Sequence, residues 1–196
     1  RPMDTAFEYV LDRTIAVLGK YGEPSGPIPT DFMLKRLDTE DLIEEDLDEF
    51  VAYELLTRGD GVSSEKRNSA LQYLAALNGN SREEELLDTL AILNDKQPGR
   101  KALGAMLVQL DRPQLEVHRS RLTAMARRID DPSLAAFATA GLIASSGSAD
   151  EVWQQAHQGS GPSPSVVLAS LDHISDPEFD LKWDLILIKI LTPSLI

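Results

Sequence analysis

The chain has 196 residues, 42% of them apolar, and a net charge of −13 from 32 acidic and 19 basic side chains. It has no cysteine, which excludes disulfides, zinc–thiolate sites, iron–sulfur clusters and covalently attached c-type haem within these residues. The acidic balance disfavours phosphate backbones and anionic lipid surfaces, and no apolar run reaches the roughly 20 residues of a spanning helix. We therefore expect neither a nucleic-acid partner nor membrane insertion.

The two ends of the chain suggest a piece of a longer protein. The first residue is Arg1 rather than methionine, and no charged segment followed by an apolar one marks a signal peptide. The last segment, from Trp183 to Ile196, is largely apolar, which is typical of a helix that packs against a further layer. We expect one helical domain over residues 1–196, excised from a longer multidomain chain, with a subdivision near 95–113.

Helix signals follow one another along the chain with short breaks, and no convincing alternating strand interrupts them. Apolar residues at helical spacing, with Ser, Asp, Gly and Pro at the ends, mark about eleven helices. They lie around 4–22, 30–37, 47–59, 63–79, 81–93, 103–112, 115–129, 131–143, 148–156, 163–174 and 176–191. The sequence therefore predicts an all-α protein.

Two segments carry the serine and glutamate spacing of a capping box, in which the serine accepts from the first turn and the glutamate reaches back. They are Ser81 with Glu84, and Ser148 with Glu151. The helical phase of the neighbouring segments places Leu74, Leu77 and Leu122 on core-facing positions. The same phase makes Ile129 the end of the helix that starts near Leu115.

A repeat connects two of the helix starts. Asp131-Pro132 and Asp176-Pro177 both follow an apolar helix end, and they lie 45 residues apart. Two-helix HEAT units have periods of about 40–47 residues, although three helices are expected within this interval. The pattern favours an α-α superhelix of HEAT- or ARM-like helix pairs. An irregular helical bundle that reuses the same caps is the alternative.

Several segments carry a family resemblance. They are Tyr53–Ala75, Phe7–Ile15, Asp150–Trp153 and Ile174–Pro177. Together they resemble the helical middle region of large exported proteins of planctomycete type, which join a dehydrogenase-like β-propeller, a HEAT-like region and a c-type cytochrome domain. The resemblance implies a periplasmic or otherwise exported location and a sugar-oxidising, electron-transferring parent. None of that family's haem ligands or catalytic residues has a matching position here.

The most acidic segment runs from Asp38 to Glu49 and has eight carboxylates in twelve residues. A calcium loop needs alternating ligands around a central glycine, and here Leu42, Ile43 and Leu47 interrupt the run at helical spacing. The favoured interpretation is a solvated helical face whose acids stabilise the positive end of the next helix. A dock for a basic protein and a metal site remain the alternatives.

The densest basic segment contains Arg119, Arg121, Arg127 and Arg128. One interpretation is a solvated face that pairs with acidic residues of neighbouring helices. The sharper interpretation is one wall of a groove that binds an acidic peptide. We refer to these four residues as the arginine stripe and predict them as the protein-binding residues of the chain.

No motif supplies a catalytic centre. His118, His157 and His173 lack metal-ligand spacing, and Gly159–Pro162 is expected to be a plain turn because no strand precedes it and no lysine follows. We expect no cofactor, metal or small-molecule substrate. The sequence favours a non-catalytic scaffold or interaction module that spaces or docks domains of its parent chain or binds another protein. The alternative is an all-α enzyme that uses carboxylates as general acid and base.

Overall fold

The computed structural model describes residue 34 and residues 37–174, and every regular element within them is a helix. This confirms the all-α prediction. In chain order the elements are α3 (Thr39–Glu44), α4 (Glu49–Thr57), α5 (Ser64–Asn78), α6 (Arg82–Ile92), α7 (Gly99–Val108), α8 (Arg112–Val117), α9 (Arg119–Ala126), α10 (Pro132–Ser146), α11 (Ala149–His157), α12 (Pro164–Ser170) and a 3-10 turn, η1 (Leu171–His173). The helices expected around 4–22 and 176–191 lie outside the described residues, as does most of the one around 30–37.

Local caps begin and end several of these helices where the sequence places them. At the start of α6, the backbone N–H of Ser81 donates to Glu84 Oε2 at 2.8 Å, and the N–H of Glu84 donates to Ser81 Oγ at 3.2 Å. This confirms the first capping box. Helices α5 and α10 each end at a glycine in the left-handed region, with φ of 71° at Gly79 and 65° at Gly147.

The second predicted capping box is wrong. The N–H of Ser148 donates to Ser146 Oγ at 3.2 Å, so it is already satisfied by the preceding helix. The carboxylate of Glu151 instead accepts from Arg119 Nη2 at 2.7 Å. The Glu151 side chain, which the local motif assigned to capping, therefore forms a long-range ion pair instead.

The single helix expected around 115–129 is also wrong, because it is divided into α8 and α9. His118, with φ of −98° and ψ of 9°, lies between the two helices. The first of them begins earlier than expected, and its Gln114 side chain accepts from the N–H of Asp111 at 3.0 Å. Ile129 follows the end of α9 and is 94% exposed, so it does not continue the buried face.

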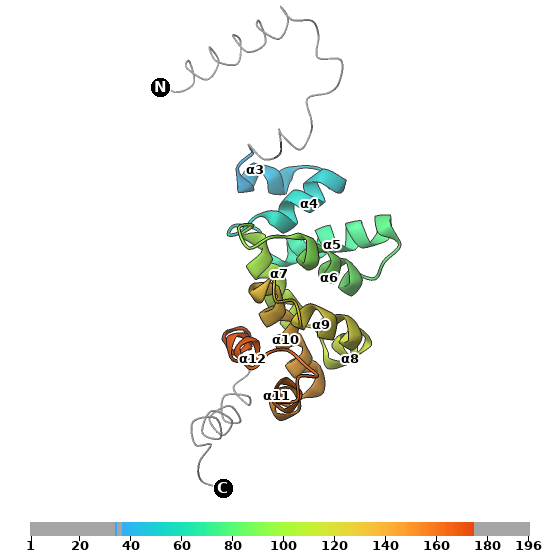
Figure 1. Ribbon diagram of the computed structural model, residues 1–196. Coiled ribbons are helices and arrows are strands. Elements are labelled where there is room, and N and C mark those ends of the chain that lie inside the picture. The colour runs from blue at the N-terminus through green and yellow to red at the C-terminus, as the bar shows by residue number, and fades with distance from the viewer. Residues whose placement is uncertain (1–33, 35–36, 175–196) are drawn as a thin grey trace, which may run out of the picture.

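Leu77 is the other buried position that was wrongly predicted. It is 56% exposed, whereas Leu74 and Leu122 are buried as expected. Helix α5 has 15 residues and its partner α4 has nine, so the last turn of α5 extends beyond the helix that covers its first part (Figure 1). The short helix α3 lies within the acidic run, where a solvated helical face was expected, and its N-cap is Asp38, whose side chain accepts from the N–H of Asp41 at 2.9 Å.

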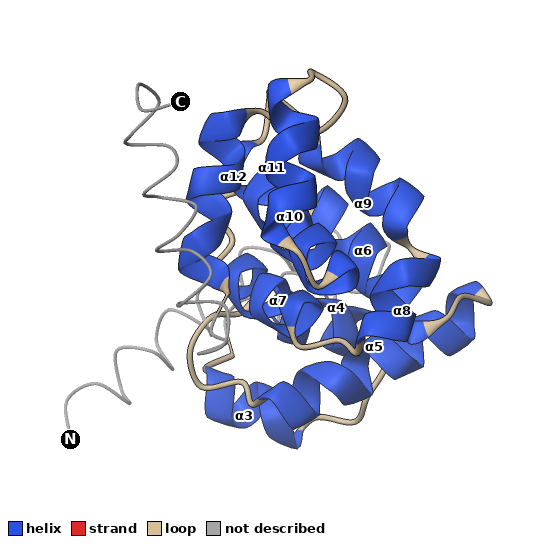
Figure 2. Ribbon diagram, turned by 90° about the horizontal axis from the view of Figure 1, so that it is seen from below, coloured by secondary structure: helices blue, strands red, loops and turns tan. Residues whose placement is uncertain are grey.

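The helices are stacked along one direction, from α3 and α4 at one end to α11 and α12 at the other (Figure 1). Helices α4, α7 and α10 form a row down the middle, since α4 packs against α7 and α7 packs against α10. The pairs α5–α6 and α8–α9 lie along one side of this row. Seen from below, α10 lies among its neighbours, with α11 and α12 on one side and α9 on the other (Figure 2).

Helix α10 is the centre of the second half of the stack. It packs against α7, α8, α9, α11, α12 and η1, and apolar or small side chains occupy almost all of its circumference. A helix that is apolar on all sides is a buried helix. The small residues allow close approach: Gly104 of α7 lies directly against the ring of Phe137, which is 3% exposed. The hydrophobic core continues without a break from Leu34 to Val167, through residues 95–113.

Two arginines hold the N-terminal part of this core together. Arg67 of α5 is 2% exposed, and its guanidinium donates to the carbonyls of Leu55 (2.9 Å), Leu56 and Gly59 at the end of α4. Arg58 donates to the carbonyls of Leu34 (2.8 Å) and Leu37 (2.9 Å). Because the last carbonyls of a helix have no intrahelical partner, Arg67 satisfies carbonyl groups at the end of α4 that burial would otherwise leave unpaired.

Candidate functional site

The arginine stripe lies on α9 and the turn that follows it, and its members have different environments. Arg119 pairs with Glu151 of α11 at 2.7 Å and with Glu116 at 3.4 Å. Arg121 forms an ion pair with Asp88 of α6. These two arginines therefore connect α9 to α6, earlier in the stack, and to α11, later in it. This arrangement agrees with the first interpretation of the stripe, in which it pairs with acidic residues of neighbouring helices.

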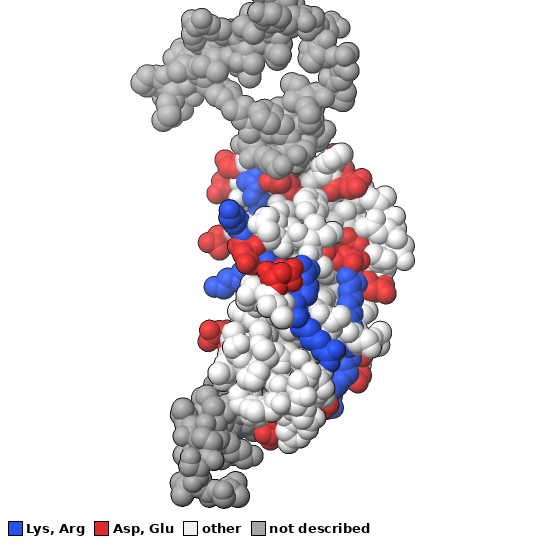
Figure 3. Space-filling view, in the orientation of Figure 1, with Lys and Arg blue, Asp and Glu red and all other residues white. Residues whose placement is uncertain are grey.

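Arg127 and Arg128 have partners close to the turn. Arg127 donates from Nη2 to the backbone carbonyl of Ser160, which is a neutral acceptor, so this contact does not neutralise its charge. Arg128 pairs with Asp130, two residues further along, through Nη2 to Oδ2 at 2.7 Å and Nε to Oδ1 at 3.3 Å. Figure 3 shows a band of basic side chains across this face, in the region where Figure 1 places α8 and α9, with acidic side chains beside it.

Arg127 and Arg128 also line a hollow of about 470 Å³ between two loops. One wall is the turn from α9 to α10, and the other is the loop from α11 to α12. Apart from the two arginines, its side chains are apolar or small: Ala126, Ile129, Pro132, Ala156, Pro162, Ser163, Pro164, Ser165 and Val166, with Gly159 and Gly161. We call this hollow, lined by residues 126–132 and 156–166, the loop groove.

The second wall of the loop groove is held by local hydrogen bonds. The N–H groups of Ser160 and Gly161 both donate to the carbonyl of Gln155, at 3.0 and 3.1 Å. Gly159, with φ of 70°, makes the left-handed turn that ends α11. Pro162 is buried, and Ser163 begins α12 by accepting from the N–H of Val166 at 3.4 Å. The predicted plain turn at 159–162 is thus one side of a preformed groove.

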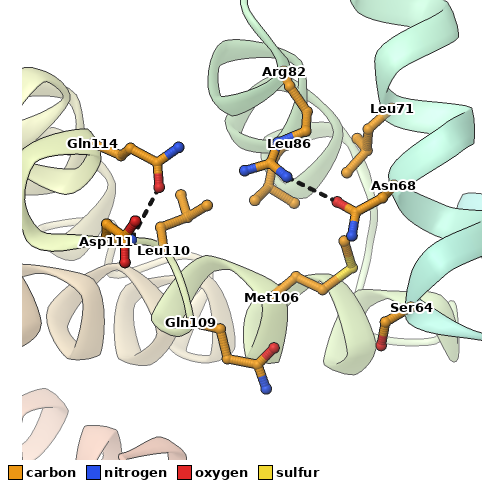
Figure 4. A pocket seen from close by; sticks show the side chains of 10 residues that line it. All are labelled: Ser64, Asn68, Leu71, Arg82, Leu86, Met106, Gln109, Leu110, Asp111 and Gln114. Atoms are coloured by element: carbon orange, nitrogen blue, oxygen red, sulfur yellow. Dashed lines mark hydrogen bonds between the residues drawn. The ribbon is translucent and has the colours of Figure 1, made fainter.

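Two other hollows differ from the loop groove in their charge. The first, of about 330 Å³, lies between α5–α6 and α7–α8 over an apolar floor that includes Leu71 and Met106 (Figure 4). Its Arg82 donates to Asn68 Oδ1 at 3.1 Å and pairs with Glu83 at 2.9 Å. Because the basic side chain is matched by an acidic one, the charge of this hollow favours no class of ligand.

The second of these hollows, of about 470 Å³, is lined by Arg100, Lys101, Asp60 and Asp95. Arg100 is 3% exposed and forms ion pairs with Asp95 and with Asp131, the N-cap of α10. This network ties the start of α7 to the start of α10. Of these three hollows, only the loop groove has charged lining residues that are all basic.

The other sequence-predicted candidates have structural roles in the described part of the chain. Within the acidic run, Asp38 caps α3 and Asp48 caps α4, accepting from the N–H of Val51 at 2.8 Å. No cluster of three or more His, Asp or Glu side chains there could hold a metal ion. His118 lies between α8 and α9, and His157 ends α11 with Nδ1 3.0 Å from the carbonyl of Trp153.

His173 lies on η1, with its ring 4.4 Å from that of Phe137. Burial lowers its pKa, as does Lys101, against the opposing effect of Asp172. The two buried carboxylates of the described residues are also engaged: Glu54 pairs with Arg58 at 3.0 Å, and Glu85 accepts from the carboxamides of Asn78, the last residue of α5, and Asn80. Neither lines any of the three hollows. An enzyme that uses carboxylates as general acid and base therefore remains a prediction, and no arrangement of the described carboxylates supports it.

No protein-family model matches the chain, and neither a curated protein nor a solved structure matches it. None of the helices described here combines the length and the apolar character needed to cross a membrane.

Proposed function

We propose that this chain is a non-catalytic helical-repeat module that docks a segment of another protein or of a further domain of its parent chain. The observation that carries the proposal is the loop groove: a preformed, mainly apolar hollow whose charged lining residues are Arg127 and Arg128. An exposed apolar hollow bordered by polar groups is typical of a protein-binding site. The nearly fully exposed side chain of Ile129 at its edge adds apolar surface that a partner would bury.

The packing of the helices supports a superhelix of three-helix units rather than an irregular bundle. The units would be α4–α6, α7–α9 and α10–α12, with the first helix of each forming the central row. Each unit then packs mainly against its neighbours, as in a solenoid. The ion pairs of Arg119 and Arg121 connect adjacent units and would fix their relative position.

The biological setting of the module rests on the family resemblance. On that basis we propose that it spaces or docks the domains of a larger exported redox protein in the periplasm or outside the cell. The sugar-oxidising and electron-transfer chemistry would belong to other domains of that parent, since the described residues supply a binding surface and helical packing instead.

A selection of peptides tests the docking role. The full chain would be screened against displayed random 12-residue peptides, and enriched peptides would be measured by calorimetry against the soluble chain. We expect binding that is lost when Ser165, an exposed residue lining the loop groove, is changed to Trp and fills it. The matched control is Ser69→Trp, on the exposed face of α5. The proposal would be contradicted if no peptide is enriched, or if the enriched peptides bind the Ser165→Trp variant as well as they bind the parent chain.

A further inference from the structure

We infer that the segment bound in the loop groove is acidic, and that one of its carboxylates replaces Asp130 as the partner of Arg128. This inference rests on the proposed docking function and names the chemistry of its partner. It also assigns Asp130 a regulatory role, as a built-in competitor for the bound segment. The geometry of four features leads to it: the charge of the groove, its loop walls, the Arg128–Asp130 pair and the carbonyl-bound Arg127.

The charges of the loop groove select an acidic partner. Arg127 and Arg128 are its charged lining residues, in a chain whose net charge is −13. Guanidinium groups bind carboxylates through two parallel N–H donors, which gives both strength and orientation. Basic residues beside an apolar hollow therefore fit a segment that alternates acidic and apolar side chains, with an apolar side chain in the hollow.

The walls of the groove determine how such a segment can bind. They consist of loops and helix starts that contain Pro132, Pro162 and Pro164, which have no N–H to donate. A partner therefore cannot add to this surface as a β-strand, because a ladder needs regular backbone donors and acceptors. Side-chain insertion and the arginine contacts have to supply the affinity.

The Arg128–Asp130 pair occupies the site that the partner would use. Its two hydrogen bonds run from Nη2 and Nε of Arg128 to the two carboxylate oxygens of Asp130. A carboxylate of a bound segment would accept the same two hydrogen bonds. The side chains are 40% and 70% exposed. Exposed ion pairs contribute little stability, so an incoming carboxylate can replace Asp130 at a low cost. The hydrogen bond to Arg128 holds the pKa of Asp130 below its ordinary value.

Arg127 has the complementary task. Its Nη2 joins the two walls by donating to the carbonyl of Ser160, which leaves its charge available to a second carboxylate. Arg127 thus positions the loop that contains Ser160, while Arg128 binds the first acidic group. A segment with acidic residues two positions apart can contact both arginines from the same side of an extended chain.

The test uses the full chain and a fluorescein-labelled heptapeptide that alternates glutamate and leucine, measured by fluorescence anisotropy. Heptapeptides alternating lysine with leucine and glutamate with serine are the controls for charge and for the apolar side chain. We expect saturable binding of the first peptide only, weakened by salt. Arg128→Gln should weaken it about fivefold or more, because the variant removes the bidentate contact.

Asp130→Asn is the decisive variant, and we expect it to tighten binding about two- to fivefold, the range an exposed ion pair supplies. Glu45→Gln makes the same charge change at the end of α3 and should leave the affinity unchanged. Circular dichroism confirms that each variant is folded. Unchanged or weaker binding by Asp130→Asn, or an equal gain from Glu45→Gln, would overturn the role of Asp130. If the acidic peptide fails to bind while the binding of the selected peptides is still lost in Ser165→Trp, the inference that the partner is acidic would be overturned, but the proposed docking function would not.

Discussion

Two glycines at the interface between α7 and α10 should respond in opposite ways to the same substitution. A Cβ added at Gly104 would lie 2.6 Å from Phe137 Cγ and closer still to two atoms at the edge of the ring. A Cβ added at Gly141 would meet Leu122 at 3.5 and 3.6 Å and Leu107 at 3.8 Å, which are ordinary contacts. Both glycines are buried inside helices, so Gly104→Ala and Gly141→Ala form a matched pair.

The expected magnitudes follow from two opposing effects. Replacing glycine by alanine inside a helix stabilises it by about 1 kcal/mol, because the unfolded chain loses freedom and the helix shields its backbone. At Gly141 this gain should appear almost undiminished. At Gly104 the buried ring of Phe137 has to move, and overpacking of a core costs about 1–3 kcal/mol, occasionally more. We therefore expect Gly141→Ala to stabilise by about 0.5–1 kcal/mol and Gly104→Ala to destabilise by about 1–2 kcal/mol.

Urea denaturation monitored by circular dichroism measures both variants. The sign of the change in unfolding free energy should differ between them, with the same dependence on urea as the parent chain. Phe137→Leu in the Gly104→Ala background should recover part of the loss, because the smaller side chain gives room to the new methyl group. If both alanine variants stabilise the chain equally, α7 does not approach α10 at Phe137, and the packing of the central row would be refuted.

Three further predictions concern the core and its charges. Leu122→Ala should cost about 2–5 kcal/mol of unfolding free energy because Leu122 is fully buried, whereas Leu77→Ala, at a position 56% exposed, should cost under about 1 kcal/mol in the same urea assay. Arg67→Met should cost about 2–4 kcal/mol because it leaves buried carbonyls at the end of α4 without a donor, and a loss below about 1 kcal/mol would contradict that role. Burial lowers the pKa of His173, so the unfolded chain binds a proton more readily than the folded one as pH falls below about 6.5. The urea midpoint of the parent chain should therefore fall over this pH range, and it should fall less in His173→Gln. Parallel pH profiles of the two proteins would argue against this effect of His173.

The sequence predicted those parts of the fold that depend on neighbouring residues. The capping box at Ser81 and Glu84, the glycine end of α5, and the Asp131-Pro132 start all involve groups within one helical turn. Such interactions are readable because the spacing between donor and acceptor is fixed by the helix itself. The all-α class followed from the same signals.

The errors arose where residues distant in the sequence compete for a side chain or a surface. Glu151 has the spacing of a capping residue, yet Arg119, 32 positions earlier, takes its carboxylate. Leu77 has the phase of a core residue, yet α4 is too short to cover it. Neither outcome is encoded in a local pattern, since each depends on which helices become neighbours.

The loop groove shows the same limit at the candidate site. The sequence singled out Arg127 and Arg128, but the apolar wall opposite them starts about 30 residues later, in a loop that looked like a plain turn. The sequence did not single out Asp130, for which we propose a role as competitor, because it is one acid among many. The unusual density of glycine and proline at 159–164 was the available signal, since such residues mark a loop, and binding residues are often found on loops.

The most direct test of the account is to map where a bound segment lies on the chain. Heteronuclear NMR of the ¹⁵N-labelled chain, titrated with the peptide that alternates glutamate and leucine, would report every backbone amide separately. We expect the largest shift changes within residues 126–133 and 156–167, the two walls of the loop groove and their immediate neighbours. Saturable changes centred elsewhere, or a spectrum that does not respond to the peptide, would contradict it.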